Sequence, residues 1–88
     1  MNAGNIYEAV AIAQSAVLKL IESGCDVLSV GVDTLVGGLK PRILVARNEE
    51  LDVLVMDEHA VVTESPELGA GRRVASMDMR GCRVSWVV

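Results

Sequence analysis

The stretch that decides the fold reads RVASMDMRGCRVSWVV and runs from Arg73 to Val88. Two runs of strand-forming residues flank Arg80-Gly81, and a glycine in a two-residue link permits the positive φ angles of hairpin turns. In the second run an apolar residue falls at every second position, which is typical of a strand with one buried face. We therefore expect an antiparallel hairpin in which Trp86 is the largest core residue.

At the other end of the chain, an amphipathic helix is predicted to begin after Asn5. The Asn5 side chain can accept a hydrogen bond from a free N–H of the first turn, while Glu8 reaches back to the cap. Gly24 suits the left-handed position that follows a helix, so the helix should end at about Ser23. Apolar residues recur at spacings of three and four and are expected to face the core, namely Ile6, Val10, Ala13, Val17, Leu20 and Ile21.

Two strands are predicted after this helix. The segment 25–33 is rich in β-branched residues, with Leu28, Val30 and Val32 on one face. The segment 34–40 contains a glycine pair before Pro41 and is expected to be a loop, and 42–47 reads as the second strand. If the loop only reverses the chain, these two strands pair antiparallel.

The middle of the sequence allows two interpretations. Residues 49–56 have acids in a first turn after Asn48, and Leu51, Leu54 and Val55 would share one face of a short helix. Alternatively, the β-branched residues of this run form a strand that pairs with residues 60–63 as a hairpin. We favour the helix, and we expect residues 65–71 to be a loop because of their proline and glycine content.

These elements predict a single α+β domain over residues 1–88. One long N-terminal helix packs on a mainly antiparallel sheet of four or five strands, with a short second helix where 49–56 is helical. The chain has 88 residues, which is enough for only one core. No internal repeat is visible.

The composition limits the classes of partner. The net charge of −4 argues against binding nucleic acid through bulk charge, so we expect no direct nucleic-acid contact. No apolar run is long enough to cross a bilayer and no signal peptide is recognisable, so the expected location is the cytoplasm. Cys25 and Cys82 are too few for a disulfide framework and are expected to be reduced and buried.

No motif predicts catalysis, a metal or a cofactor. Asp57-Glu58-His59 joins a histidine to carboxylates, but three consecutive side chains diverge on a helix or a strand, so a solvated turn is the better interpretation. Gly37-Gly38-Leu39-Lys40 is followed by Pro41 and lacks the spacing and the helix start of a phosphate loop. The two cysteines and one histidine do not make up the four ligands of a zinc site unless carboxylates complete the set or two chains pair. We therefore expect a protein that is not an enzyme and needs no cofactor.

Charge layout is the informative feature. Between Asn48 and Gly71 there are seven acids and no Lys or Arg, whereas Arg72, Arg73, Arg80 and Arg83 gather in the terminal hairpin. An acidic surface can steer a small domain to a protein with a basic surface, and an ordinary solubilising surface is the alternative. The candidate partner-binding residues are Glu49, Glu50, Asp52, Asp57 and Glu58.

The chain resembles the short α+β accessory proteins encoded by phages and prophages, among them anti-defence proteins such as anti-CRISPRs. The likeness rests on the helix that ends in Ser23-Gly24, on Lys40-Pro41-Arg42-Ile43 and on Gly81-Cys82-Arg83-Val84-Ser85-Trp86. It implies a module that binds and inhibits or modulates a host protein, for example of a defence system, in the host cytosol if a phage encodes it. The alternative is a self-associating structural or accessory protein, a homodimer through an open edge of the C-terminal strand.

Overall fold

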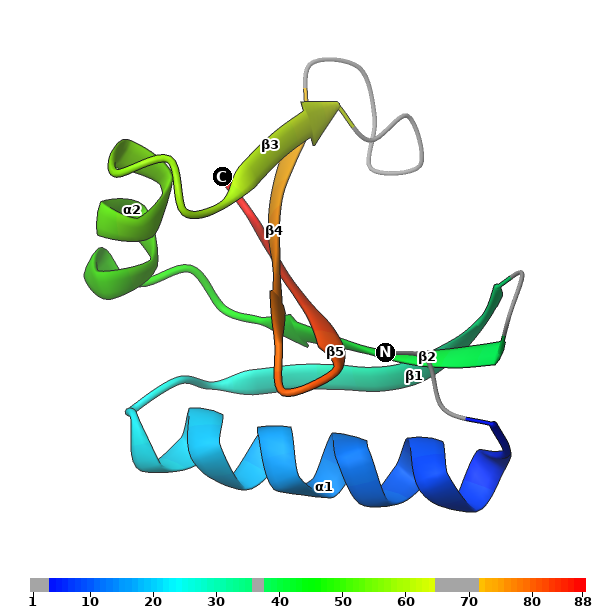
Figure 1. The fold of residues 1–88 in the computed structure, drawn as a ribbon. Coiled ribbons are helices and arrows are strands. Elements are labelled where there is room, and N and C mark those ends of the chain that lie inside the picture. The colour runs from blue at the N-terminus through cyan, green and yellow to red at the C-terminus, as the bar shows by residue number, and fades with distance from the viewer. Residues whose placement is uncertain (1–3, 36–37, 65–71) are drawn as a thin grey trace.

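The computed structural model describes residues 4–35, 38–64 and 72–88, and it has the expected α+β fold (Figure 1). Two helices and five strands follow one another along the chain. Their bounds are α1 Ile6–Glu22, β1 Val27–Leu35, β2 Gly38–Val45, α2 Glu49–Met56, β3 Val61–Glu64, β4 Arg73–Met79 and β5 Cys82–Val87. The predicted loop at 65–71 lies outside the described residues. No described helix is long and apolar enough to cross a membrane.

α1 begins and ends where the sequence predicts, but Glu8 reaches Gly4, the residue before the cap, and not the cap residue Asn5 itself. The Asn5 side chain accepts a 2.9 Å hydrogen bond from the N–H of Glu8, and the Glu8 carboxylate accepts from the N–H of Gly4 at 2.7 Å. At the other end, Gly24 has a φ of +86° and donates to the carbonyl of Ile21. The N–H of Cys25 donates to the carbonyl of Leu20, which completes a Schellman motif.

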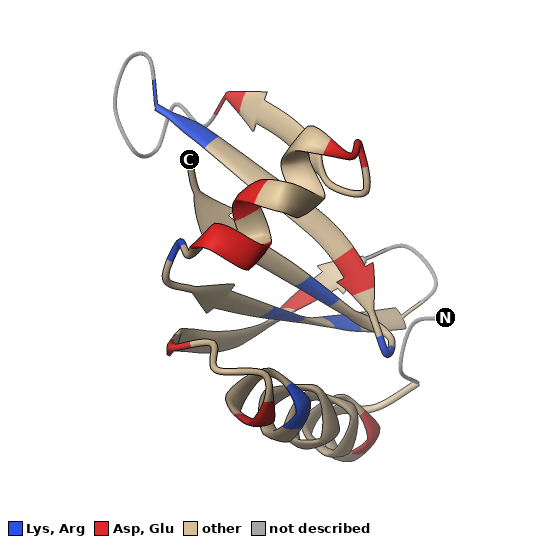
Figure 2. Ribbon diagram, turned by 90° about the vertical axis from the view of Figure 1, so that its left-hand side faces the viewer, with Lys and Arg blue, Asp and Glu red and all other residues tan. Residues whose placement is uncertain are grey.

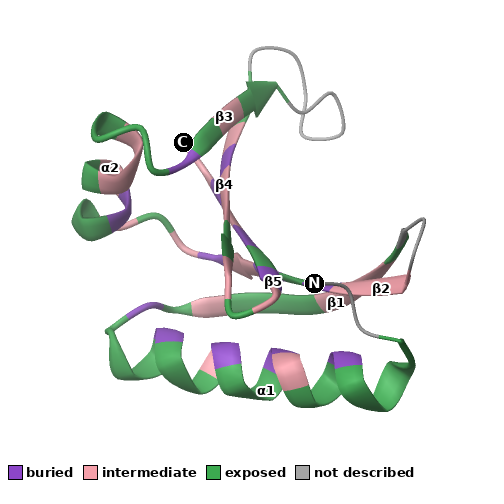
Figure 3. Ribbon diagram, viewed as in Figure 1, coloured by how far each residue is buried: buried purple, intermediate pink, exposed green. Residues whose placement is uncertain are grey.

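The side of α1 that packs on the sheet differs from the prediction. The residues buried there are Ala9, Ala13, Ala16 and Leu20, whereas Ile6, Val10 and Ile21 are exposed (Figure 3). The expected stripe was therefore only partly right. Both sets recur at spacings of three and four, so periodicity alone could not decide between them. The small alanines allow the helix to lie close to the strands.

The five strands form one mixed sheet in the order β1-β2-β5-β4-β3. The pairs β1–β2, β3–β4 and β4–β5 are antiparallel, as expected for neighbours along the chain, and β2 and β5 pair in parallel with Ile43 opposite Val84. The C-terminal strand therefore has a neighbour on both sides. Its predicted role as an open edge is wrong, because Val84 and Trp86 are core residues and place β5 in the middle of the sheet.

The first hairpin is longer than expected. The strands continue to Leu35 and resume at Gly38, which pair with each other, so most of the predicted loop 34–40 is strand. Pro41 was expected to close the loop but lies buried inside β2, opposite Val32. The terminal hairpin is confirmed: Met79 pairs with Cys82, and Arg80 and Gly81 have φ angles of +51° and +81°.

Residues 49–56 are helical, so the strand alternative is wrong. The Asn48 side chain caps α2 by accepting a 2.9 Å hydrogen bond from the N–H of Leu51, which is buried. The helix ends in the same backbone arrangement as α1. Here Glu58, with a φ of +60°, takes the left-handed position, and the N–H of His59 donates to the carbonyl of Leu54 at 2.9 Å.

The core lies between α1, α2 and one face of the sheet. Trp86 is fully buried, as predicted, together with Ile43, Val45 and Val84. α1 adds Ala16 and Leu20 to this cluster and α2 adds Leu51. Cys25 and Cys82 are free thiols and both are buried.

Candidate protein-binding surfaces

The acidic residues singled out from the sequence lie on α2 and on the turn that follows it. We call Glu49, Glu50, Asp52, Asp57 and Glu58 the acidic surface. The first three occupy the first turn of α2, and the last two follow its C-terminal end, so they gather at both ends of one short helix (Figure 2). Eight helical residues span about 12 Å, so both groups fall within the footprint of one partner.

Four of these five side chains project freely into solvent. Asp52 differs because its carboxylate binds the Arg47 guanidinium, with Oδ1 2.8 Å from Nε and Oδ2 3.3 Å from Nη2. This hydrogen bond, together with the charge of Asp52, raises the pKa of Arg47. Within the described residues, no ion pair involves Glu49, Glu50, Asp57 or Glu58. The charge available to a partner therefore comes from these four residues, all of them exposed.

The Asp57-Glu58-His59 segment is a helix-ending turn. Asp57 is the C-cap of α2, Glu58 holds the left-handed position, and all three residues are exposed. No group of three or more His, Cys, Asp or Glu side chains within the described ranges is arranged to hold a metal ion.

Both thiols are buried, and the surroundings of Cys82 make it unreactive. Burial raises the pKa of Cys82, and the charge of Lys40 only partly opposes this effect. A thiol with a raised pKa stays protonated and is a poor nucleophile at neutral pH. The Cys25 sulfur accepts a hydrogen bond from the side chain of Asn48 at 3.7 Å, which links it to the cap of α2.

The arginines of the terminal hairpin do not form one cluster. Arg73 begins β4, whereas Arg80 lies in the turn at the opposite end and donates to Ser15 of α1 at 3.4 Å. Arg83 lies 4.0 Å from Asp78, which is also 3.0 Å from Lys40. These charges are spread along the hairpin, and among the described ion pairs only Arg83 of these arginines has an acidic partner.

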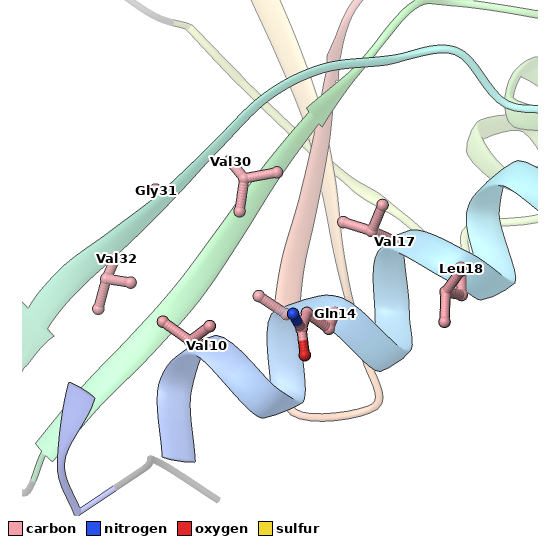
Figure 4. A pocket seen from close by; sticks show the side chains of 8 residues that line it. Val10, Gln14, Val17, Leu18, Val30, Gly31 and Val32 are labelled. Carbon is pink, nitrogen blue, oxygen red and sulfur yellow. The ribbon is translucent and has the colours of Figure 1, made fainter. Parts of the chain in front are cut away.

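An apolar groove that was not predicted from the sequence lies between α1 and β1. The groove has a volume of about 630 Å³ and is lined from α1 by Val10, Gln14, Val17 and Leu18 and from β1 by Val30 and Val32. The valine side chains point into the space between the two elements (Figure 4). The signal in the sequence was the apolar residues of α1 outside its buried face, but Val10 and Val17 were assigned to the core.

No family model matches this chain, and no curated protein or solved structure was found to be similar to it.

Proposed function

We propose that this chain is a non-enzymatic protein-binding module that docks its acidic surface on a basic surface of another protein. In keeping with the resemblance to phage accessory proteins, the partner would be a host protein, for example of a defence system, that the module inhibits or modulates in the cytoplasm. The observation that carries the proposal is the set of four exposed acids around α2 that form no ion pair with any described residue, within a part of the sequence that has no Lys or Arg.

Electrostatics gives this surface a defined role in binding. Complementary charges steer two proteins together and raise the association rate, and salt screens the effect over about 8–10 Å at ordinary ionic strength. Asp52 is a poor contact residue because Arg47 already neutralises it. Glu50 and Asp57 are the better choice, since they lie at opposite ends of α2 and are both exposed.

The test compares two double variants of equal charge. Glu50→Lys with Asp57→Lys changes the net charge from −4 to 0, since each reversal adds two positive charges. Glu22→Lys with Glu64→Lys makes the same change at exposed acids of α1 and β3. Tagged wild type and both variants are used to capture proteins from a host lysate, and mass spectrometry identifies the partner.

The first variant should bind the partner at least tenfold more weakly, and the second should bind within about threefold of wild type. Wild-type binding should also weaken as salt rises. Equal losses in the two variants would show that only net charge matters, and unchanged binding in both would show that the acids only keep the domain soluble. Either result contradicts the proposal.

A second candidate function is self-association. The open edge of β1, with the apolar groove beside it, favours this candidate.

A further inference from the structure

α1 has two apolar stripes, and it exposes the one with the larger side chains. The buried stripe consists of Ala9, Ala13, Ala16 and Leu20. The second stripe, at alternating spacings of three and four, consists of Tyr7, Val10, Gln14, Val17 and Ile21. In this stripe Val10 is 47% exposed, Ile21 57% and Tyr7 85%. Such a row on a helix surface is typical of a face that packs against another helix.

The sheet is open next to this stripe. β1 and β3 are the two edges of the described sheet, and β3 is only four residues long. β1 has nine residues, without lysine or proline and without a charge from Val27 to Val32. Its single irregularity lies between Val27 and Ser29, so the rest of the strand can accept a neighbour. Natural proteins usually protect long edge strands with charges or proline, and β1 has neither between Val27 and Val32.

We propose that a second copy of this chain covers the groove, pairing its β1 antiparallel with this β1 about a two-fold axis. The strand sequence suits this arrangement, because centring the pair on Val30 places Leu28 opposite Val32 of the second copy and Ser29 opposite Gly31 of the second copy. In these pairs apolar residues face apolar residues and small ones face small ones, while Val27 lies opposite Asp33 of the second copy. No two carboxylates lie directly opposite each other.

The same axis suits the helices. Gln14 and Val30 line the same groove, and the proposed arrangement places the axis close to both. Val10 precedes Gln14 by four residues and Val17 follows it by three. In an antiparallel helix pair centred on Gln14, Val10 of one copy therefore lies opposite Val17 of the other. The two Gln14 side chains meet at the axis, where amides can hydrogen-bond to each other, and a single polar residue in an apolar stripe is a known means of fixing register.

Strand spacing brings the helices to a suitable distance. α1 packs on β1 and β2, one to one and a half strand spacings from the proposed axis. With strands about 4.8 Å apart, the two helices would lie about 10–14 Å apart. Directly packed helices lie about 8–10 Å apart, so the Val10, Val17 and Leu18 side chains of both copies have room to fill the gap.

The surface is large enough for a reversible dimer. The apolar residues that line the groove continue as Leu28 along β1 and as Ile21 along α1. Leu28 and Ile21 are exposed, as are Val10, Leu18 and Val30. At roughly 100 Å² for each half-exposed residue, these five in two copies bury about 1,000 Å² before any backbone is counted, close to the ~1,200 Å² at which stable interfaces begin. No residue of α2 lines the groove, so the acidic surface stays free in the dimer.

The test is the molecular mass in solution, by sedimentation and light scattering, across concentrations up to hundreds of micromolar. Wild type should move toward twice the 9.4 kDa of one chain as concentration rises. Val30→Lys and Gln14→Lys should each raise the dimer dissociation constant at least tenfold. Val61→Lys is the matched control, because Val61 is an exposed valine on the other edge strand, and it should leave the constant within about twofold.

Thermal unfolding checks that each variant is folded. If Val30→Lys fails to fold, Gln14→Lys decides, since Gln14 is exposed on the helix surface. A wild-type monomer at every concentration would overturn the proposal and leave the groove to a different protein. A dimer that Val61→Lys weakens as much as the groove variants do would also overturn it. Glu50→Lys with Asp57→Lys should remain dimeric, which separates this proposal from the proposed function.

Discussion

Replacing Glu58 by glycine should stabilise the protein by about 0.5–1 kcal/mol. The two helices end in the same Schellman motif, with Gly24 in the left-handed position after α1 and Glu58 in that position after α2. A left-handed φ costs a residue with a Cβ about 1–2 kcal/mol. Glycine avoids this cost, but its greater freedom in the unfolded chain offsets about 0.4–1 kcal/mol of the gain.

Glu58→Ala is the control that separates backbone conformation from charge. Both variants remove a carboxylate from the negative end of the α2 dipole, and this removal is itself mildly stabilising. Only Glu58→Gly also relieves the left-handed φ of +60°. The unfolding free energy of Glu58→Gly should therefore exceed that of Glu58→Ala by the full cost of holding a residue with a Cβ at a left-handed φ.

The reverse change at the other helix tests the same reasoning. A Cβ added at Gly24 would meet no atom within 4 Å, so Gly24→Ala changes backbone conformational energy without a steric clash. It should cost about 1 kcal/mol. Urea unfolding at unchanged m-value measures all three variants. Equal stabilities of Glu58→Gly and Glu58→Ala, or no loss in Gly24→Ala, would refute the assignment of strain to this position.

Two further predictions concern the core. Trp86→Ala should lower the unfolding free energy by about 3–5 kcal/mol, and a loss below about 1 kcal/mol in urea unfolding would contradict the burial of Trp86. Trp86→Phe should cost less, because the buried Nε1 has no hydrogen-bond partner within the described residues and phenylalanine removes that donor. Burial raises the pKa of Cys82, so the folded thiol stays protonated where the unfolded thiol begins to ionise, and the unfolding free energy should fall as pH rises above about 9. Cys82→Ala should remove that part of the pH dependence, and an identical profile in both proteins would show that Cys82 does not cause it.

The elements with local signals could be predicted from the sequence. The Asn5 and Asn48 caps, the Gly24 end of α1 and the Arg80-Gly81 turn each depend on residues a few positions apart. Such signals act whatever the rest of the chain does. The helical nature of 49–56 was decided in the same way, by a cap and a first turn of acids.

The arrangement of these elements could not be predicted, because it depends on contacts far apart in sequence. Nothing near Ile43 or Val84 indicates that their strands pair in parallel. Nor could periodicity show that α1 buries its alanines, since both of its apolar stripes have the same spacing. The C-terminal strand was predicted to be an open edge of the sheet. It is not, because its parallel pairing with β2 places it in the middle of the strand order.

The candidate surfaces show the same division. Exposure of Glu49, Glu50, Asp57 and Glu58 follows from their charge, and the sequence predicts it. The ion pair between Asp52 and Arg47 joins a residue of α2 to one outside the helix, and it was not predicted from the sequence. The groove was missed because it needs α1 and β1 side by side.

The central place of β5 has a consequence for how the chain reaches its native state. Without β5, the α1-β1-β2 unit and the β3–β4 pair share no strand contact, so each is a fragment of the final sheet. The pairing that joins them links residues 42–44 with 83–85, about forty positions later, so a long loop must close first. Folding should therefore be slow for a domain of this size, and it should be cooperative, because one strand completes both halves at once.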